Sequence, residues 1–208
     1  MRLSQVHTTI RNKINKIRTL LWYRFMFKKF GENSCVSAPF FPYNTEFVEL
    51  GEQVFIAPNV RMEVHYRIPE GPIGSLRIGN RVVIGQRVNI SCCESLTIGD
   101  DVTIAAGCYI SDNNHGINPS GPNYMAQPLS SARTEIGSGV WLGQNVAILA
   151  GSKIGERSII GAGSIVTGEI PPYSIAVGSP ARVIKQYCFV TKVWKKVVRT
   201  EATLKMTI

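Results

Sequence analysis

Branched aliphatic residues recur every six positions from Ile78 almost to the end of the chain. A small residue usually follows each one, and a second small or aliphatic residue stands four places after it. The repeats are Ile78-Gly79…Val82, Ile84-Gly85…Val88, Ile98-Gly99…Val102, Ile104-Ala105…Cys108, Ile136-Gly137…Val140, Leu142-Gly143…Val146, Ile154-Gly155…Ser158 and Ile160-Gly161…Ser164. A period of six fits one short strand and one corner, so three repeats make one triangular coil. The pattern predicts an all-β fold, a parallel β-helix solenoid.

The residue types at each position follow from this geometry. We expect the first aliphatic residue to point into the core, and the small residue after it to let the backbone turn sharply at the corner. Weaker repeats at Leu50-Gly51…Val54 and Ile56-Ala57…Val60 extend the solenoid upstream to about residue 48. Cys108 occupies a small inward position, which predicts a buried thiol.

The repeat is interrupted once, by a polar stretch that contains proline and glycine. After Ile110 no clear repeat returns until Ile136, which predicts an inserted loop over residues 112–134 without regular structure. Long insertions in a regular array usually carry function. His115 lies at the root of this loop and is therefore a candidate catalytic residue.

Residues 1–30 differ from the repeats and predict a basic amphipathic helix. Apolar residues recur there at helical spacing: Ile10, Ile14, Ile17, Leu21 and Phe25. The segment carries eight basic side chains and no acidic one, and its apolar run is too short to span a bilayer. Three interpretations stay open: a cap over the first coil, a helix lying on an anionic membrane, and a docking site for a partner enzyme.

Charge is distributed unevenly along the chain, and the cysteines form no recognisable framework. Residues 31–181, the predicted β-helix domain, hold 8 basic and 13 acidic side chains, whereas residues 182–208, a basic and short helical tail, hold 7 basic and 1 acidic. The five cysteines show no C-x-x-C pair and no even framework, so we expect a reducing, cytoplasmic location. We expect no nucleic-acid partner.

The second half of the repeat region carries more specific motifs. These are Val140-Trp141-Leu142-Gly143, Ile160-Gly161-Ala162-Gly163-Ser164, Ile170-Pro171-Pro172 and the run from Gly178 to Lys185. With them the chain, over roughly residues 31–186, resembles the hexapeptide-repeat acyltransferases, within them the maltose, galactoside, xenobiotic and O-antigen acetyltransferases. The resemblance implies a left-handed β-helix and a homotrimer that binds acetyl-CoA between neighbouring subunits.

The resemblance also assigns roles to residues. His115 stands where the family has its general base, which removes a proton from a sugar hydroxyl as the oxygen attacks the thioester. The oxyanion of the intermediate needs a preorganised donor, which we expect from the backbone N–H of a corner such as Gly143, and no metal is needed. Asp112 is expected at the acceptor site, where it either orients the imidazole or is a solvated loop carboxylate.

The resemblance also implies contacts with the coenzyme and the acceptor, at positions where the motifs match those of the family. Trp141, Gly143 and Ala162 resemble residues along the pantetheine arm of the coenzyme, whereas Arg182 and Lys185 resemble cations near its phosphates. Asn89, Tyr124 and Met125 are expected to contact the acceptor, Asn89 from a coil and the other two from the inserted loop.

The sequence therefore predicts an acetyl-CoA-dependent O-acetyltransferase acting on a carbohydrate of a surface polysaccharide or its precursor. The basic N-terminal segment favours peripheral contact with the inner membrane face. An antibiotic, a free sugar or a nucleotide-linked amino sugar is the alternative acceptor. A γ-carbonic anhydrase or a non-catalytic scaffold is the alternative of another class, although His7, His65 and His115, the only histidines, are widely spaced.

Overall fold

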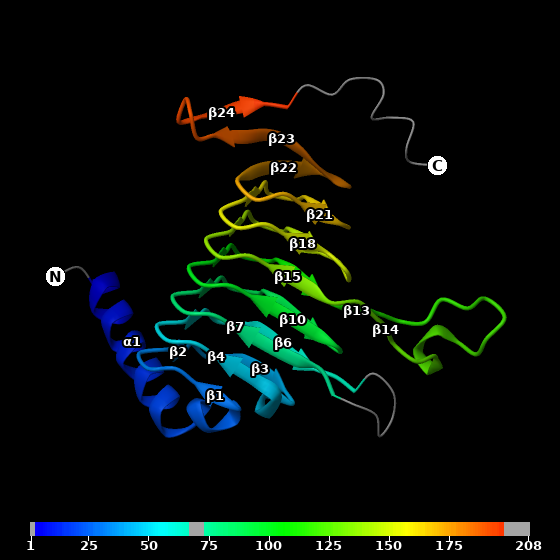
Figure 1. The fold of residues 1–208 in the computed structure, drawn as a ribbon. Coiled ribbons are helices and arrows are strands. Elements are labelled where there is room, and N and C mark those ends of the chain that lie inside the picture. Colours follow the sequence, from blue (N-terminus) through cyan, green and yellow to red (C-terminus); the bar gives the residue numbers. More distant parts are fainter. Residues whose placement is uncertain (1–2, 67–72, 198–208) are drawn as a thin grey trace.

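The structure, a computed structural model, describes residues 3–66 and 73–197, with side-chain positions from Thr8 onward (Figure 1). The chain winds through three parallel faces that stack coil upon coil. Face A holds β1 (Lys29–Phe30), β4 (Val48–Leu50), β7 (Ser75–Ile78), β10 (Ser95–Ile98), β15 (Thr134–Ile136), β18 (Lys153–Ile154) and β21 (Glu169–Ile170).

The other two faces follow in chain order within each coil. Face B holds β2 (Cys35–Val36), β5 (Phe55–Ile56), β8 (Val83–Ile84), β11 (Thr103–Ile104), β16 (Trp141–Leu142), β19 (Ile159–Ile160), β22 (Ser174–Gly178), β23 (Ala181–Cys188) and β24 (Val193–Lys196). Face C holds β3 (Phe40–Tyr43), β6 (Val60–Val64), β9 (Asn89–Cys92), β12 (Tyr109–Ser111), β17 (Ala147–Ile148) and β20 (Ile165–Val166). A short 3-10 turn, η2 (Thr45–Phe47), follows β3.

The predicted left-handed parallel β-helix is confirmed, and its repeats fill the core as expected. Equivalent aliphatic residues pair in register between coils, as Ile98 does with Ile136 and Ile104 with Leu142. These four side chains, and the thiol of Cys108, are at most 2% exposed. Each coil therefore buries its apolar residues only against its neighbours.

The small residue after each aliphatic one serves a different purpose from the one predicted. The left-handed backbone of the corner falls two residues later, as at Arg81 and Asn145. Gly143 is needed because a Cβ there would lie 2.6 Å from the backbone nitrogen of Ala162 in the next coil. Glycine thus permits the close approach of stacked corners rather than the turn itself.

The solenoid begins upstream of residue 48, the point to which the recognisable six-residue repeats extend. Strand β1 starts at Lys29, and β1 and β2 pair in parallel with β4 and β5, so a complete coil precedes residue 48. The repeat pattern did not reveal this coil, although it falls within residues 31–181, because Phe30-Gly31…Ser34 and Val36-Ser37…Phe40 replace the usual aliphatic pairs with aromatic and hydroxyl residues.

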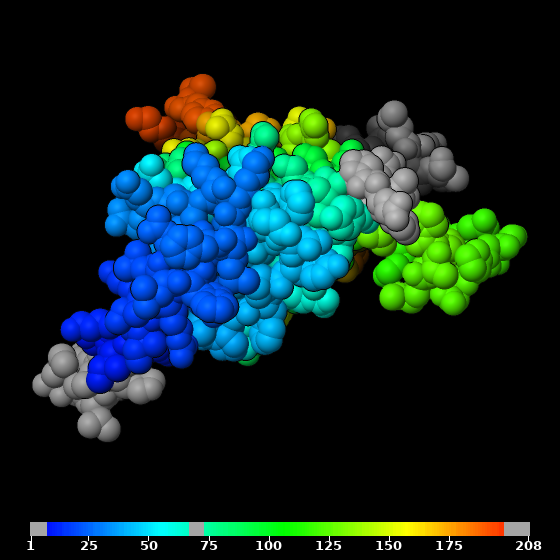
Figure 2. Space-filling view, turned by 90° about the horizontal axis from the view of Figure 1, so that it is seen from below, coloured from blue at the N-terminus to red at the C-terminus, as the bar shows by residue number. Residues whose placement is uncertain are grey.

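The N-terminal segment forms α1 (Leu3–Leu21) and then the 3-10 turn η1 (Tyr23–Met26), at the first-coil end of the stack (Figures 1 and 2). The predicted helix is confirmed, and α1 packs against β2, the edge strand of face B. Phe27 is 7% exposed and joins the hydrophobic core.

The expectation of a helical C-terminal tail is wrong for the residues that the structure describes. From Ala181 the chain forms β23, which pairs antiparallel with β22, and β24 then pairs antiparallel with β23. Aromatic contacts among Tyr173, Tyr187, Phe189 and Trp194 stabilise this arrangement. Alternating exposure along β23 shows why the strand is favoured there. Residues 198–208 of the predicted tail lie outside the described part of the chain.

Candidate functional site

His115 lines a pocket of about 460 Å³ at the root of the inserted loop, together with Tyr124 and Ser130. The loop leaves the stack at the corner between faces C and A and projects away from the coils (Figure 1). Strands β13 (Asn113–Asn114) and β14 (Ser130–Ser131) pair antiparallel and bring its two ends together. This pairing fixes the backbone immediately before His115.

The inserted loop is more ordered than the sequence predicted. Besides the β13–β14 pair it contains a 3-10 turn, η3 (Tyr124–Ala126). The buried side chain of Gln127 donates to the carbonyl oxygens of Asn118 and Pro122 at 2.9 and 2.8 Å and accepts from the Asn118 amide at 2.9 Å. This order depends on the hydrogen bonds of one polar side chain, so the hydrophobic periodicity of the sequence did not predict it.

Asp112 does not lie where the sequence placed it. Its carboxylate is fully buried and accepts the backbone N–H groups of Cys93, Glu94 and Ser95 at 2.7 to 2.9 Å. Three successive amides form an anion-binding turn, so the expectations of a solvated carboxylate, an imidazole partner and an acceptor contact are all wrong. Burial and then the Asp112 charge raise the pKa of the Cys92 thiol far above its ordinary value.

Asn113, the next residue toward His115, is also held by hydrogen bonds. Its amide nitrogen donates to the Ser91 carbonyl oxygen at 3.2 Å and to the Ser91 hydroxyl at 3.1 Å. The loop root is thereby tied to β9, the neighbouring strand of face C. Asn89, two residues before Ser91, is exposed on that face beside Tyr109 of the next coil.

The two candidates on η3 are placed differently. Tyr124 lines the His115 pocket, whereas Met125 is 77% exposed and does not line it. Ser130, which does line the pocket, was missed because a serine in a polar loop gives no distinguishing pattern.

Several candidate cofactor residues lie along the outer surface of face B. Trp141 pairs with Ile159, Ile159 with Ile175, and Ile175 with Lys185, which makes one column across four strands. Trp141 is 52% exposed at one end, and Ala162 is exposed at the corner that follows β19. With strands about 4.8 Å apart, the column is about 14 Å long and offers an apolar strip with a cation at its end.

Gly143 lies at the corner after β16, but its amide is already engaged. The Gly143 N–H donates to the Ile160 carbonyl oxygen at 2.8 Å, within the hydrogen bonds that join the coils. The expectation that this N–H stabilises an oxyanion is therefore wrong, because a donor used by the fold is not free for a reacting group.

The basic end of the column contains more cations than the sequence indicated. Lys185 lies opposite Lys196 across the β23–β24 pair, so the two side chains share one face of the sheet. Arg182 is exposed near the start of β23 and donates to its neighbouring carbonyl oxygen at 2.9 Å. Lys196 was missed because a helical tail would have placed it elsewhere.

The candidates thus form two groups at different corners of the prism. His115 and Tyr124 lie where face C meets face A, whereas Gly143 and Ala162 lie where face B meets face C. The width of face C separates the groups within one chain. Among the described residues, no three His, Cys, Asp or Glu side chains gather as a metal ion would need.

Comparisons with known proteins agree with this architecture. Residues 133–168 match the family described as bacterial transferase hexapeptide (six repeats), and residues 75–112 match the hexapeptide repeat of succinyl-transferase. The putative lipopolysaccharide biosynthesis O-acetyl transferase WbbJ of Escherichia coli K12 is 34% identical over 166 residues, covering 76% of this chain and 81% of that protein. Galactoside O-acetyltransferase of the same organism is 33% identical over 144 residues, covering 67% and 64%.

Solved structures show the same fold at lower identity. AntD, an N-acyltransferase from Bacillus cereus in complex with dTDP and 3-hydroxybutyryl-CoA, superposes with a TM-score of 0.67 at 22% identity, covering 79% of this chain and 85% of that one. A hexapeptide-repeat-containing acetyltransferase from Vibrio cholerae complexed with acetyl-CoA gives 0.57 at 23% identity, covering 88% and 84%.

Proposed function

The chain belongs to the hexapeptide-repeat acyltransferases, and from that premise we propose that it is an acetyl-CoA-dependent O-acetyltransferase. The acceptor we propose is a sugar hydroxyl of a surface polysaccharide or its precursor. One observation carries this proposal: an exposed imidazole, that of His115, lines a pocket beside the Tyr124 and Ser130 side chains. Hydroxyl-bearing side chains around a base suit a polyhydroxylated acceptor.

The reaction requires one proton-transfer group and no acyl-enzyme. Neutral His115 removes the proton from the sugar hydroxyl while that oxygen attacks the carbonyl carbon of the acetyl thioester. The tetrahedral intermediate collapses with cleavage of the carbon–sulfur bond, and the imidazolium returns the proton to the departing coenzyme A thiolate. Tyr124 would orient the acceptor within the pocket.

We propose that the coenzyme lies along the column on face B. The indole of Trp141 and the side chains of Ile159 and Ile175 would contact its apolar arm, while Gly143 and Ala162 admit close approach at the corner. Lys185, Lys196 and Arg182 would face its phosphates, where cations are favourable. Both ends of the column then match the chemistry of one extended ligand.

This placement requires more than one subunit. The imidazole lies at the corner between faces C and A, whereas the proposed coenzyme column lies on face B, so the thioester bound by one chain cannot reach that chain's own histidine without crossing another face. A symmetric homotrimer would bring the His115 corner of one subunit against the coenzyme corner of its neighbour. Asn89 and Met125 would complete the acceptor site.

Labelled acetyl-CoA offered with a panel of acceptors tests the proposed function. We expect label to appear as an alkali-labile ester on a polysaccharide precursor. Replacing His115 with Ala or Asn should lower kcat by about a hundredfold or more, with acetyl-CoA affinity nearly unchanged.

The panel also separates the competing acceptors. Transfer to the amine of a nucleotide-linked amino sugar, to an antibiotic or to a free sugar, with none to the polysaccharide precursor, would refute the proposed acceptor while keeping the chemistry. A His115→Ala protein with normal kcat would remove the histidine from the mechanism.

A further inference from the structure

Helix α1 rests on the first coil through its polar side. Asn15 and Thr19 are 5% and 3% exposed. The Thr19 hydroxyl accepts from the Val36 amide at 3.0 Å, and the Asn15 side-chain oxygen accepts from the Ala38 amide at 3.5 Å. These contacts satisfy backbone groups at the edge of β2, which would otherwise be unpaired.

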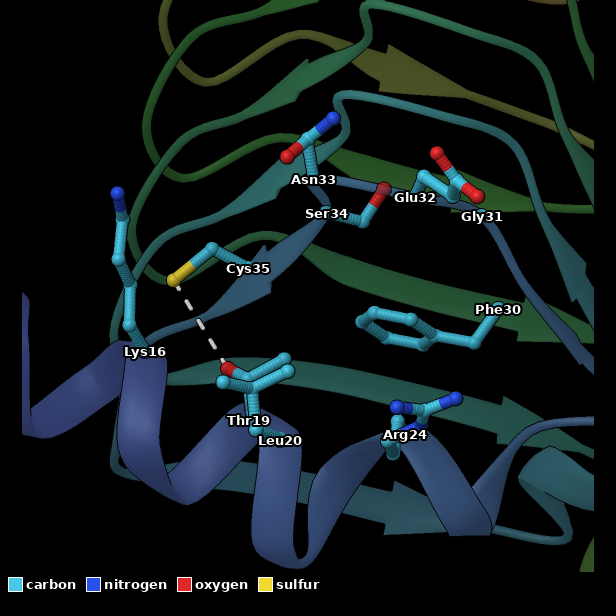
Figure 3. Close-up of a pocket in the computed structure, with 10 residues that line it drawn as sticks. All are labelled: Lys16, Thr19, Leu20, Arg24, Phe30, Gly31, Glu32, Asn33, Ser34 and Cys35. Carbon is cyan, nitrogen blue, oxygen red and sulfur yellow. Dashed lines mark hydrogen bonds between the residues drawn. The ribbon is translucent and has the colours of Figure 1, made fainter.

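The contact between helix and coil is not close-packed. A pocket of about 460 Å³ remains between α1 and the corner at residues 31–35, lined on the helix side by Lys16, Thr19 and Leu20 (Figure 3). A helix that served only as a hydrophobic cap would fill this space with its apolar side chains. Here Thr19 points toward Cys35 instead (Figure 3).

The apolar stripe of α1 faces away from the coils. Ile10, Ile14, Ile17 and Leu21 follow one another at intervals of four, three and four residues, so they share one face of the helix. Their exposed fractions are 52%, 43%, 55% and 72%. Trp22 and Phe25, just after the helix in the chain, are 69% and 74% exposed and add to the apolar surface of this segment. Contiguous exposed apolar surface of this kind marks an interaction site.

Cations border the ridge on both sides. At about 100° per residue, Arg11 and Arg18 project from one flank of the stripe and Lys13 from the other, whereas Lys16 lines the pocket beside the first coil. Residues 1–30 contain no acidic residue to neutralise them. Lys and Arg at the flanks of an apolar helix face can extend their charged ends to a polar interface while their stems stay apolar.

We propose that the apolar ridge of α1 (Ile10, Ile14, Ile17 and Leu21), together with Trp22 and Phe25 just after the helix, lies in the surface of an anionic lipid bilayer. The apolar side chains enter the boundary between head groups and acyl chains, and the flanking cations face the lipid phosphates. No described helix is long and apolar enough to cross a membrane, so the contact is along the helix rather than through it.

Charge distinguishes lipid from a second copy of this chain. Two copies joined ridge to ridge would bring two segments of +8 together, which is repulsive, whereas anionic head groups complement that charge. Helix α1 and the inserted loop lie on opposite sides of the molecule (Figures 1 and 2), so the loop does not cover the helix.

Sedimentation of the full-length protein with lipid vesicles tests the proposal. We expect binding to phosphatidylcholine vesicles that contain phosphatidylglycerol, weak binding without the anionic lipid, and release as salt rises. The triple variant Ile14→Gln, Ile17→Gln, Leu21→Gln keeps good helix formers and should bind at least about tenfold more weakly. Arg11→Gln, Lys13→Gln, Arg18→Gln should weaken binding on the order of a hundredfold at low salt.

A matched control removes exposed apolar side chains from the opposite end of the stack. Val190→Gln with Val193→Gln, at positions 93% and 51% exposed, should leave vesicle binding unchanged. Circular dichroism and light scattering on every variant report folding and oligomeric size.

Three results would overturn the proposal: no sedimentation of the intact protein with acidic vesicles, unchanged binding by the ridge variant, or a change of oligomeric size in that variant. The last would assign the ridge to an interface between subunits. Because vesicle binding is measured without acetyl-CoA, its failure leaves the proposed acetyl transfer untouched.

Discussion

Asp112 connects the interior of the solenoid to the loop that carries the candidate base. Its two carboxylate oxygens accept three consecutive amides of the turn at residues 93–95, and Asn113 beside it contacts β9. Removing the carboxylate leaves buried N–H groups without an acceptor, which costs about 1–3 kcal/mol. The backbone that leads to His115 would shift as a result.

We therefore expect Asp112→Ala to lower both the free energy of unfolding and kcat, while the KM for acetyl-CoA changes little. Urea unfolding and steady-state kinetics measure these two effects. Asp101→Asn is the control, since that carboxylate is paired with Arg81 on the exposed surface and Asn tolerates the left-handed backbone at this position, so the unfolding midpoint should stay nearly unchanged. Equal loss of stability in both variants would contradict a special role for Asp112.

The cysteines should differ sharply in reactivity. Hydrogen bonding from Thr191 lowers the pKa of the Cys188 thiol to about 7, whereas burial raises that of Cys108. Because the thiolate is the reactive form, alkylation of Cys188 by iodoacetamide should reach half its maximal rate near pH 7. Peptide mass spectrometry should show Cys92 and Cys108 unmodified under the same conditions. A half-maximal rate for Cys188 near pH 9 would contradict this.

The repeat positions were predictable from sequence because their residue types report burial directly. Ile104 and Leu142 have to be apolar in any solenoid, and their spacing fixes the strand. Asp112 was not predictable, since a carboxylate next to a loop ordinarily faces water and its buried acceptor role depends on a turn one coil away. Gly143 is an intermediate case. A small residue was expected there for the turn, whereas the structure requires it for the close approach of the next coil.

Among the elements, the inserted loop depends on one side chain for its order. Gln127 joins Asn118, Pro122 and the chain near Gly116. Replacing it with Ala should loosen η3 and with it Tyr124, so kcat should fall while acetyl-CoA affinity stays the same.

Limited proteolysis measures the loosening of the loop directly, as faster cleavage within residues 116–130 of the Gln127→Ala protein. Ser120→Ala, at an exposed position of the same loop, serves as the control and should cleave at the rate of the unmodified protein. Equal cleavage of all three proteins would show that Gln127 does not set the order of the loop.

Two elements, α1 and β23, differ from what their sequence patterns suggested. A stripe of Ile and Leu on a helix usually marks the buried face, but in α1 the polar residues Asn15 and Thr19 make the contact because they complete the hydrogen bonding of a strand edge. In β23 the alternating pattern was present, yet a helical tail was expected there. In both cases the structure depends on the strand against which the element packs, and the element's own residues do not specify that strand.

At the scale of the whole molecule, a shared active site predicts complementation between inactive variants. His115→Ala removes the proposed base, and Ala162→Glu, at an exposed corner, should repel the coenzyme. Each variant alone should be inactive. Mixed trimers from coexpression should recover up to about a quarter of the normal activity, since one interface in four pairs two intact halves. No recovery would contradict a site built from two subunits.

The stacking of coils has a further consequence for an enzyme held on a bilayer. Successive strands of a face lie about 4.8 Å apart, and β12, which leads to His115, is three strands from β3 in the first coil. The stack of coils therefore holds the histidine about 14 Å from the first-coil end, measured along the stack. A sugar tethered to lipid would be modified at the residue that reaches this position, so the number of coils, in addition to the contacts in the pocket, would select which unit of a growing glycan is acetylated.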